Sequence, residues 1–185
     1  MQFLAQIDTG ATLFLAGLIP PDLPFPEWFL SFISAPGGSV FLWGIPAAFA
    51  AFRGKHTKTV RFFLLIITAL AIAAFLNGLI KNIFMRDRPY SALGMDTLGC
   101  GDIYSFPSGH AAVSFAAAVL LSRFDKKNRP WYFFLAILIS YSRIYLYCHY
   151  LSDVIAGAFF GIVFARLFLT VYFYSRSSGK EKKQS

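Results

Sequence analysis

Long apolar runs, separated by short polar segments, form the dominant pattern of this chain of 185 residues. Four of them, at about 60–80, 108–122, 131–147 and 151–174, consist almost wholly of apolar and small residues. A fifth, 39–52, is also apolar and ends in a charged segment. Because a helix crosses a bilayer with about 20 apolar residues, these runs predict membrane-spanning helices. The expected fold is all-α, an integral membrane helical bundle of five to six transmembrane helices.

The first apolar run, 3–19, leaves two placements open. It is short, Asp8 interrupts it and two prolines end it, so it either spans the membrane with tilt or lies at the interface. The Pro-rich segment that follows suits a loop with a short helix at headgroup depth. The expected organisation is an N-terminal apolar helix with a Pro-rich interfacial segment (1–38), a transmembrane core (39–174) and a basic, disordered cytoplasmic tail (175–185).

Composition supports a membrane location. Hydrophobic residues make up 57% of the chain, 22 residues are phenylalanine, and the mean hydropathy is +0.58, too apolar for an ordinary soluble domain. The two cysteines, Cys100 and Cys148, are too few for a disulfide framework and lack metal-ligand spacing. Whether they pair is left open, because disulfide geometry is strict.

Charge predicts the orientation in the membrane. The chain has a net charge of +8, and twelve of its 17 Lys and Arg lie in the segments 53–61, 123–129 and 176–183. These segments fall on one side if the runs cross as counted, and that side is expected to be cytoplasmic. Such clustering between apolar runs argues against a nucleic-acid partner. The opposite side receives the connection 81–102 and the start of the helix at 108.

The sequence Phe106-Pro107-Ser108-Gly109-His110 opens that helix and has the character of an anion site. Ser108 is a suitable N-cap, so the first backbone N–H groups of the helix point at whatever lies beside it. His110 adds a group that carries a proton near neutral pH. A capped helix with a surface histidine is the plainer interpretation, and the surrounding residues decide between the two.

Three cations lie at the same membrane boundary. Lys81 ends the predicted helix 60–80, Arg88 follows seven residues later, and Arg143 lies near the end of the helix 131–147. Arginine suits bidentate contacts with phosphate and lysine a point charge, so the three form a candidate clamp for one dianionic group. Snorkelling of basic residues at helix ends is the alternative.

His149 and Asp153 lie four residues apart, on one face of the last helix. The carboxylate can accept from one ring nitrogen and leave the other as a nucleophile or base. His110 at the same depth would supply the second role, a proton for the leaving oxygen. A structural histidine–carboxylate pair and a metal site are the alternatives, and the nearby cations argue against a divalent ion.

Three motifs together resemble a known family. Lys81-(six residues)-Arg88-Pro89, then Pro107-Ser108-Gly109-His110, then Ser142-Arg143-(five residues)-His149-(three residues)-Asp153 match the signature of the type 2 phosphatidic acid phosphatase superfamily. The resemblance spans 81–153 and implies a metal-independent lipid phosphatase without a cofactor. His149 would be the nucleophile, Asp153 its orienting partner and His110 the general acid. The phosphate-binding residues would be Lys81, Arg88, Ser108, Gly109 and Arg143.

The size is similar to that of the small bacterial members of the family. This likeness implies hydrolysis of a lipid phosphate monoester or diphosphate, at the periplasmic face of the bacterial inner membrane. Undecaprenyl diphosphate, lipid A 1-phosphate, phosphatidylglycerophosphate and phosphatidic acid stay open as substrates, and the motifs do not choose among them. The oligomeric state is open as well.

Two other classes share parts of this signature. Vanadate-dependent haloperoxidases carry it, but they are soluble and much larger, so the apolar runs argue against them. The second class is a lipid-phosphate binding or transport protein that kept the anion site and lost the chemistry. Its hallmark would be the loss of a histidine or of Asp153, and both His110 and His149 are present with Asp153.

Overall fold

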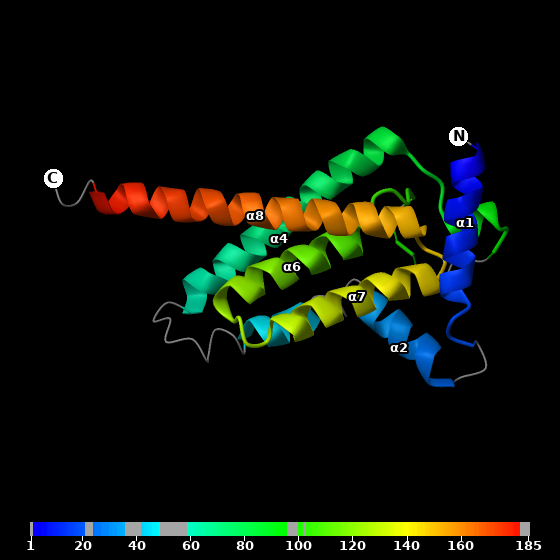
Figure 1. Cartoon of the computed structure of the whole chain (residues 1–185), viewed down its shortest axis with the longest axis horizontal. Helices are drawn as coiled ribbons and strands as arrows, with labels where there is room; N and C mark the ends of the chain where they lie inside the picture. The colour runs from blue at the N-terminus through cyan, green and yellow to red at the C-terminus, as the bar shows by residue number, and fades with distance from the viewer. Residues whose placement is uncertain are drawn as a thin grey trace.

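Helices form the regular structure throughout the described part of the chain, residues 2–20, 24–35, 42–48, 59–95, 100–101 and 103–181 of a computed structural model (Figure 1). No strand occurs among these residues, so the predicted all-α class is confirmed. The helices are α1 (Gln2–Ala16), α2 (Pro24–Ser34), α4 (Thr59–Phe84), α5 (Pro89–Ala92), α6 (Gly109–Phe124), α7 (Arg129–Tyr145) and α8 (Leu151–Glu181). Residues 42–48 are helical as well.

Helix α6 is the centre of the bundle. It lies alongside α4, α7 and α8 in Figure 1 and packs against each of them. The residues that make this possible are small, because small side chains let helix backbones approach closely. Five alanines of α6 are buried, namely Ala111, Ala112, Ala116, Ala117 and Ala118.

Helices α6 and α8 approach each other closely at Gly157 and Gly161 of α8. A Cβ atom built on Gly161 would lie 2.1 Å from the carbonyl oxygen of Ala112, a distance that no real Cβ contact adopts. Only glycine therefore fits at this crossing. Gly157 and Gly161 form a G-x-x-x-G face of α8, and its partner within the chain is α6.

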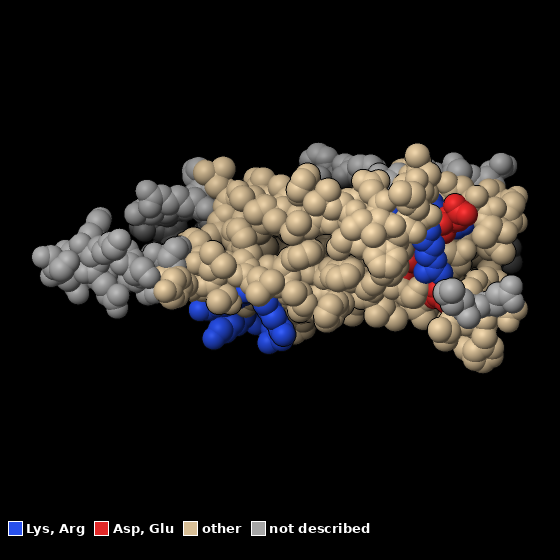
Figure 2. Space-filling view, turned by 90° about the horizontal axis from the view of Figure 1, so that it is seen from above, with Lys and Arg blue, Asp and Glu red and all other residues tan. Residues whose placement is uncertain are grey.

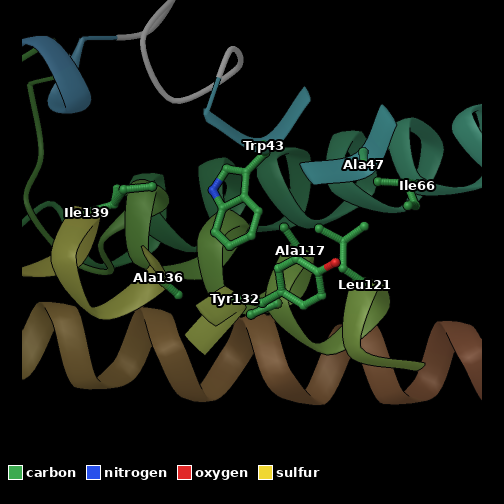
Figure 3. Packing of buried hydrophobic residues seen from close by; sticks show 9 residues of the cluster. Trp43, Ala47, Ile66, Ala117, Leu121, Tyr132, Ala136 and Ile139 are labelled. Carbon is green, nitrogen blue, oxygen red and sulfur yellow. The ribbon is translucent and has the colours of Figure 1, made fainter. Parts of the chain in front are cut away.

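A hydrophobic cluster fills the half of the bundle around residues 42–48 and the facing parts of α6 and α7 (Figure 3). Leu121 and Ile139 are at most 1% exposed, and Trp43 of the 42–48 helix belongs to the same cluster. The Trp43 indole N–H donates to the Ser114 hydroxyl at 3.2 Å, which satisfies its polar atom. This cluster fixes the position of α6 against α7.

Helix α1 lies across the end of the bundle rather than along it (Figure 1). Its 15 residues correspond to about 22 Å, shorter than a hydrocarbon core of about 30 Å. Its outward side chains are apolar, with Phe3, Leu4 and Phe14 at least 70% exposed. The short length and the exposed apolar side chains favour the interfacial placement, which stays a prediction.

Two of the described helical segments are long and apolar enough to cross a membrane, Leu64–Ala92 and Leu151–Tyr174. Figure 2 shows a surface that agrees with this: on the face in view, the charged residues gather in two separate groups, with a wide belt of other residues between them. Apolar side chains such as Ile67, Phe75 and Phe159 are exposed in these helices. The number of crossings, expected to be five to six, stays a prediction.

The helix boundaries differ from the expected ones at two places. α8 continues to Glu181, so residues 176–181, expected to be disordered, are helical; once a helix is formed, each added residue gains a hydrogen bond. The short α5 interrupts what was expected to be an irregular connection. Of the predicted helix 39–52, only residues 42–48 fall within the described part of the chain. Residues 182–185 of the expected tail lie outside the described residues.

Candidate active site

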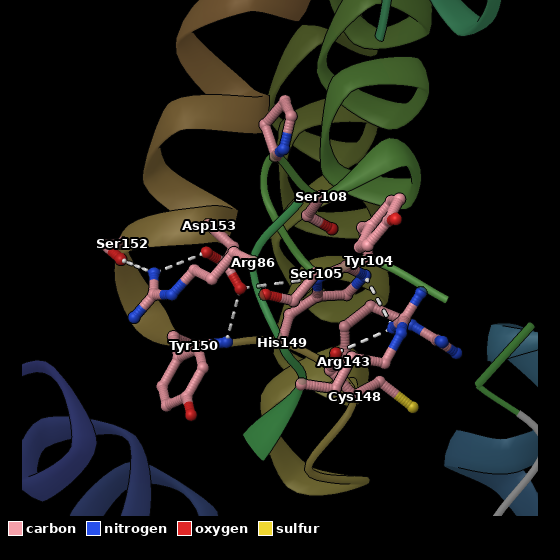
Figure 4. A network of polar contacts seen from close by, with 12 residues as sticks. Arg86, Tyr104, Ser105, Ser108, Arg143, Cys148, His149, Tyr150, Ser152 and Asp153 are labelled. Atoms are coloured by element: carbon pink, nitrogen blue, oxygen red, sulfur yellow. Dashed lines mark hydrogen bonds and ion pairs between the residues drawn. The ribbon is translucent and has the colours of Figure 1, made fainter. Parts of the chain in front are cut away.

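The predicted site residues meet at one end of the bundle, near the end of α4, the start of α6 and the turn between α7 and α8 (Figure 4). Gly109 and His110 form the first turn of α6 and are half-buried. The other six are at most 6% exposed: Lys81, Arg88, Ser108, Arg143, His149 and Asp153. Charged groups buried this deeply need partners, and neighbouring carbonyl and carboxylate oxygens supply them.

His149 lies between Asp153 and the cations. Its Nε2 is 3.4 Å from Arg88 Nη1, and its Nδ1 is 3.6 Å from Asp153 Oδ2. The second distance is too long for a hydrogen bond, and Nδ1 has no other partner among the described residues. Such contacts are often long in the free enzyme and shorten when substrate binds. The ring is thus oriented with Nε2 toward the cations and Nδ1 toward the carboxylate.

The surroundings of His149 favour its neutral form. Burial lowers its pKa well below the ordinary value, and the positive charges of Arg88, Arg143 and Lys81 lower the pKa further. His110 is close enough to act in the same direction. A neutral imidazole has a lone pair on one ring nitrogen, which a nucleophile needs, and here the ring lies among fixed positive charges that would hold an anion.

Arg88 and Lys81 are held by backbone carbonyls of the loops around the site. Arg88 Nη1 donates to the Cys148 carbonyl at 2.7 Å, and Lys81 Nζ donates to the Tyr104 carbonyl at 2.9 Å. Arg88 precedes Pro89, which begins α5 with its fixed φ angle and directs the chain away from α4. The motif spacing therefore places a lysine on α4 and an arginine after it against loops far away in the sequence.

Arg143 on α7 is held by two segments that the sequence analysis did not connect with it. Its Nη1 donates to the hydroxyl and the carbonyl of Ser34 at the end of α2, and its Nη2 donates to the Cys100 carbonyl at 3.2 Å. Cys100 forms a disulfide with Cys148, which settles the pairing that the sequence left open. α2, in the Pro-rich segment, thus contributes to the site.

The start of α6 is held by hydrogen bonds to residues of α8 and α4. Ser108 is the N-cap, as expected, and its hydroxyl accepts from the Ala111 N–H at 3.4 Å. The Ser108 N–H donates to the Asp153 backbone carbonyl at 3.0 Å. From α4, Asn77 Nδ2 donates to the Pro107 carbonyl at 3.3 Å. The helix end that is expected to bind an anion is therefore rigidly placed next to Asp153 and His149.

Asp153 has a second partner, Arg86, to which the sequence analysis assigned no role. Arg86 Nη1 lies 2.7 Å from Asp153 Oδ1, and Arg86 Nη2 lies 2.7 Å from Asp8 Oδ2 on α1 (Figure 4 shows the former contact). The Tyr150 N–H holds the other carboxylate oxygen, Oδ2, at 2.9 Å. A carboxylate in an otherwise apolar run, as at Asp8, is the sequence signal that marks such a role.

The sequence and the fold are similar to those of known proteins. The sequence model of the PAP2 superfamily matches residues 62–177, which include all eight predicted site residues. The chain therefore belongs to the PAP2 superfamily, and the relatives described below place it among the PAP2-type membrane lipid phosphatases of that superfamily.

Its relatives act on several lipid phosphates. A lipid A 4'-phosphatase of Porphyromonas gingivalis is 28% identical, with 96% of this chain and 78% of the relative aligned. An undecaprenyl-diphosphatase of Sulfolobus acidocaldarius is 32% identical, with 67% of this chain and 60% of the relative aligned.

The fold is also that of solved members. A transmembrane PAP2-type phosphatidylglycerolphosphate phosphatase from Bacillus subtilis superposes with a TM-score of 0.68 at 22% identity, covering 94% of this chain and 88% of that one. LpxE of Aquifex aeolicus gives a TM-score of 0.67 at 24% identity, covering 89% and 95%.

Proposed function

We propose that this protein hydrolyses a phosphate monoester or diphosphate on a lipid headgroup through a phosphohistidine at His149, without a metal ion. The observation that carries the proposal is the orientation of His149, whose Nε2 faces Arg88 at 3.4 Å while Nδ1 faces Asp153. A neutral ring with one nitrogen directed at an anion site and the other at a carboxylate is arranged for attack on phosphorus.

In the first step, the phosphoryl oxygens bind to the cations and to the start of α6. Nε2 of His149 attacks phosphorus, and Asp153 accepts from the Nδ1–H and stabilises the positive charge that develops on the ring. The P–N bond forms while the bond from phosphorus to the leaving oxygen breaks, and His110 donates a proton to that oxygen. The groups that hold the phosphoryl oxygens are Lys81, Arg88, Arg143, the Ser108 hydroxyl and the Gly109 N–H.

In the second step, water attacks the phosphohistidine. His110, now neutral, takes a proton from the water, the P–N bond breaks, and inorganic phosphate leaves with His149 again neutral. No step needs a metal ion: the cations around His149 supply the positive charge and would repel a divalent ion. Both oxygens of Asp153 are also engaged, by Arg86 and by the Tyr150 N–H.

The position of the site in the bundle supports a lipid headgroup as the substrate. The site lies at the end of the bundle, next to the predicted interfacial helix α1, where a headgroup would lie while its acyl or prenyl chains stay in the hydrocarbon. The relatives act on lipid A and on undecaprenyl diphosphate, and a solved neighbour on phosphatidylglycerolphosphate. These lipids, with phosphatidic acid, form the substrate class.

The proposed location is the bacterial inner membrane, with the site on the periplasmic face. The basic connection between α6 and α7 and the C-terminal end of α8 lie at the end of the bundle opposite the site (Figure 1). The Cys100–Cys148 disulfide lies at the site end, as an oxidising compartment would allow. In spheroplasts, an impermeant thiol reagent should label Ser91→Cys and leave Asp125→Cys unlabelled; the reverse result would overturn the orientation.

The test of the activity is phosphate release by the purified protein from four lipids in EDTA: phosphatidic acid, phosphatidylglycerophosphate, undecaprenyl diphosphate and lipid A. We expect release from at least one of them, and no turnover by His149→Ala. Tight binding of these lipids without release would instead support a binding or transport protein. Loss of activity in EDTA that a divalent metal restores would overturn the metal-free mechanism.

A further inference from the structure

Two polar side chains of α1 face the bundle, one helical turn apart, at the N-terminus of α8. Asp8 Oδ1 accepts from the Ser152 N–H at 3.0 Å, and Thr12 Oγ1 accepts from the Leu151 N–H at 3.0 Å. The first N–H groups of a helix lack intrahelical partners, so α1 caps a helix from which it is separated by more than a hundred residues. Both residues share this capping role.

Asp8 makes a contact that Thr12 lacks. Its Oδ2 lies 2.7 Å from Arg86 Nη2, while the other arm, Arg86 Nη1, lies 2.7 Å from Asp153 Oδ1. The same Nη1 donates to the Ser152 hydroxyl at 2.7 Å. The planar guanidinium thus bridges two carboxylates, one on α1 and one in the active site.

The bridge is partly sheltered from water. Asp153 is fully buried and Asp8 is 13% exposed at the side chain. The Tyr150 ring covers the guanidinium, with its centroid 3.9 Å from the central carbon of Arg86. Hydrogen bonds between charged groups stabilise more when they are sheltered from water than when they are exposed. The stacked Tyr150 ring also limits the rotation of the Arg86 guanidinium.

This geometry fixes which oxygen of Asp153 faces His149. Oδ1 is held by Arg86, and Oδ2, held by the Tyr150 N–H, is the oxygen 3.6 Å from His149 Nδ1. If Asp8 did not hold one arm of Arg86, both arms would be able to bind Asp153 as a bidentate pair. That arrangement would draw Oδ2 away from the histidine.

We propose that Asp8 is a positioning residue that acts through Arg86 on Asp153, so that α1 forms part of the active site. The proposal rests on the function proposed above. Asp8 touches neither substrate nor the reacting atoms; it keeps the carboxylate of Asp153 turned toward His149. Capping of α8 alone is the competing role, and Thr12 provides the matched control because it caps α8 without touching Arg86.

The experiment measures kcat and KM for p-nitrophenyl phosphate with the full-length protein in detergent. The variants are Asp8→Asn, Asp8→Glu, Arg86→Gln, the double variant Asp8→Asn/Arg86→Gln, and Thr12→Val. We expect Asp8→Asn to lower kcat on the order of tenfold with KM within about twofold, and Asp8→Glu to recover most of the loss. In the Arg86→Gln background, Asp8→Asn should have almost no further effect, because the bridge is already broken.

Several results would overturn the inference. One is an Asp8→Asn variant within about twofold of the parent in kcat; another is a Thr12→Val variant that loses as much activity. If Asp8→Asn lowered kcat by the same factor in the parent and in the Arg86→Gln background, Asp8 would act through capping of α8 alone. If Asp8→Asn fails to give a monodisperse protein, the Arg86→Lys variant replaces it in the test. Lysine keeps the positive charge but has no planar fork that can contact both carboxylates. A kcat of Arg86→Lys equal to that of the parent would then overturn the inference. A parent without phosphatase activity would overturn the proposed function first, and this inference with it.

Discussion

Gly157 of α8 lies directly against the backbone carbonyl of Ser108, the N-cap of α6. A Cβ atom on Gly157 would be 2.3 Å from the Ser108 oxygen and 3.2 Å from the Ala111 Cβ. One turn before Gly157, Asp153 accepts from the Ser108 N–H through its backbone carbonyl. The absence of a side chain at Gly157 therefore sets how closely Asp153 and the start of α6, the proposed anion site, approach each other.

Gly157→Ala should impair both stability and catalysis. The added methyl group has to push α8 away from the start of α6, which typically costs about 1–3 kcal/mol and shifts Asp153 relative to Ser108. We expect a lower midpoint of thermal unfolding and a fall in kcat of about tenfold or more. Gly78→Ala on α4 is the control, because nothing lies within 4 Å of its added Cβ. If Gly157→Ala had the thermal unfolding midpoint and the kcat of the parent, α8 would be able to move away from the start of α6 without cost, and the prediction would be wrong.

Arg88→Lys should lose much of the activity although the charge is kept. One arm of the Arg88 fork is used by the Cys148 carbonyl, at 2.7 Å, and lysine cannot hold this carbonyl and a phosphoryl oxygen in the same fixed plane. Loss of one charged contact is worth a few kcal/mol, so we expect a fall in kcat/KM on the order of a hundredfold. Arg123→Lys, at the other end of α6, is the control. A change within about twofold would make Arg88 a structural residue.

Reduction of the Cys100–Cys148 disulfide should weaken substrate binding. The carbonyl of Cys100 accepts from Arg143 and that of Cys148 from Arg88, so the bond joins the two loops that hold these arginines. In the Cys100→Ser/Cys148→Ser variant we expect stability to fall by about 2–4 kcal/mol and KM to rise more than kcat falls. Thermal unfolding and steady-state kinetics measure the two effects. Alkylation of both thiols in the untreated native protein would show that the bond is absent.

The acid limb of the pH–rate profile should lie below the ordinary histidine range. Burial and the neighbouring cations lower the pKa of His149 well below 6.5, so the free enzyme keeps its neutral nucleophile as the pH falls through that value. The unfolded chain takes up this proton near pH 6.5 and the folded chain does not, so stability should decrease as the pH falls below about 6.5. Comparison of thermal unfolding between pH 7 and 5 in the parent and in His149→Gln checks this, and an equal slope in both would contradict it.

The two histidines should differ in their dependence on the leaving group. His149→Ala should abolish turnover of every substrate, because no phosphohistidine forms. His110→Ala should be most harmful for a lipid alkoxide and least for p-nitrophenyl phosphate, whose phenolate needs little protonation. Vanadate should inhibit the parent as a five-coordinate mimic of the transferring group. Turnover by His149→Ala, together with its loss for the activated ester in His110→Ala, would exclude the proposed roles.

The sequence by itself determined the main helices and the residues to which the chemistry is assigned in the proposed function. Apolar runs predicted α4, α6, α7 and α8, because the requirement for about 20 apolar residues operates within one segment. Ser108 as N-cap and the four-residue spacing from His149 to Asp153 are local features as well. Motif spacing was enough to name eight residues that the fold gathers at one end of the bundle.

Only the tertiary structure decided which partners hold those residues. Ser34 reaches Arg143 over a separation of 109 residues, and Asp8 reaches the start of α8 over 144. No periodicity in the sequence connects such positions, because their contact depends on how α1 and α2 pack against the ends of α7 and α8. The role of Arg86 was missed for the same reason: both of its carboxylate partners, Asp8 and Asp153, come from helices at opposite ends of the chain.

The packing of α1 on the start of α8 and the disulfide were decided in the same way. Composition allowed the first apolar run to span the membrane or to lie at the interface. The polar side chains of Asp8 and Thr12 in this run are explained by the tertiary structure, in which they accept from the first N–H groups of α8. Cys100 and Cys148 are 48 residues apart, and the fold brings their Cα atoms to 5.4 Å. The physical reason is common to all these cases: a local pattern sets the free energy of a helix, whereas the contacts between helices depend on the complementary shapes and polar groups of two distant segments.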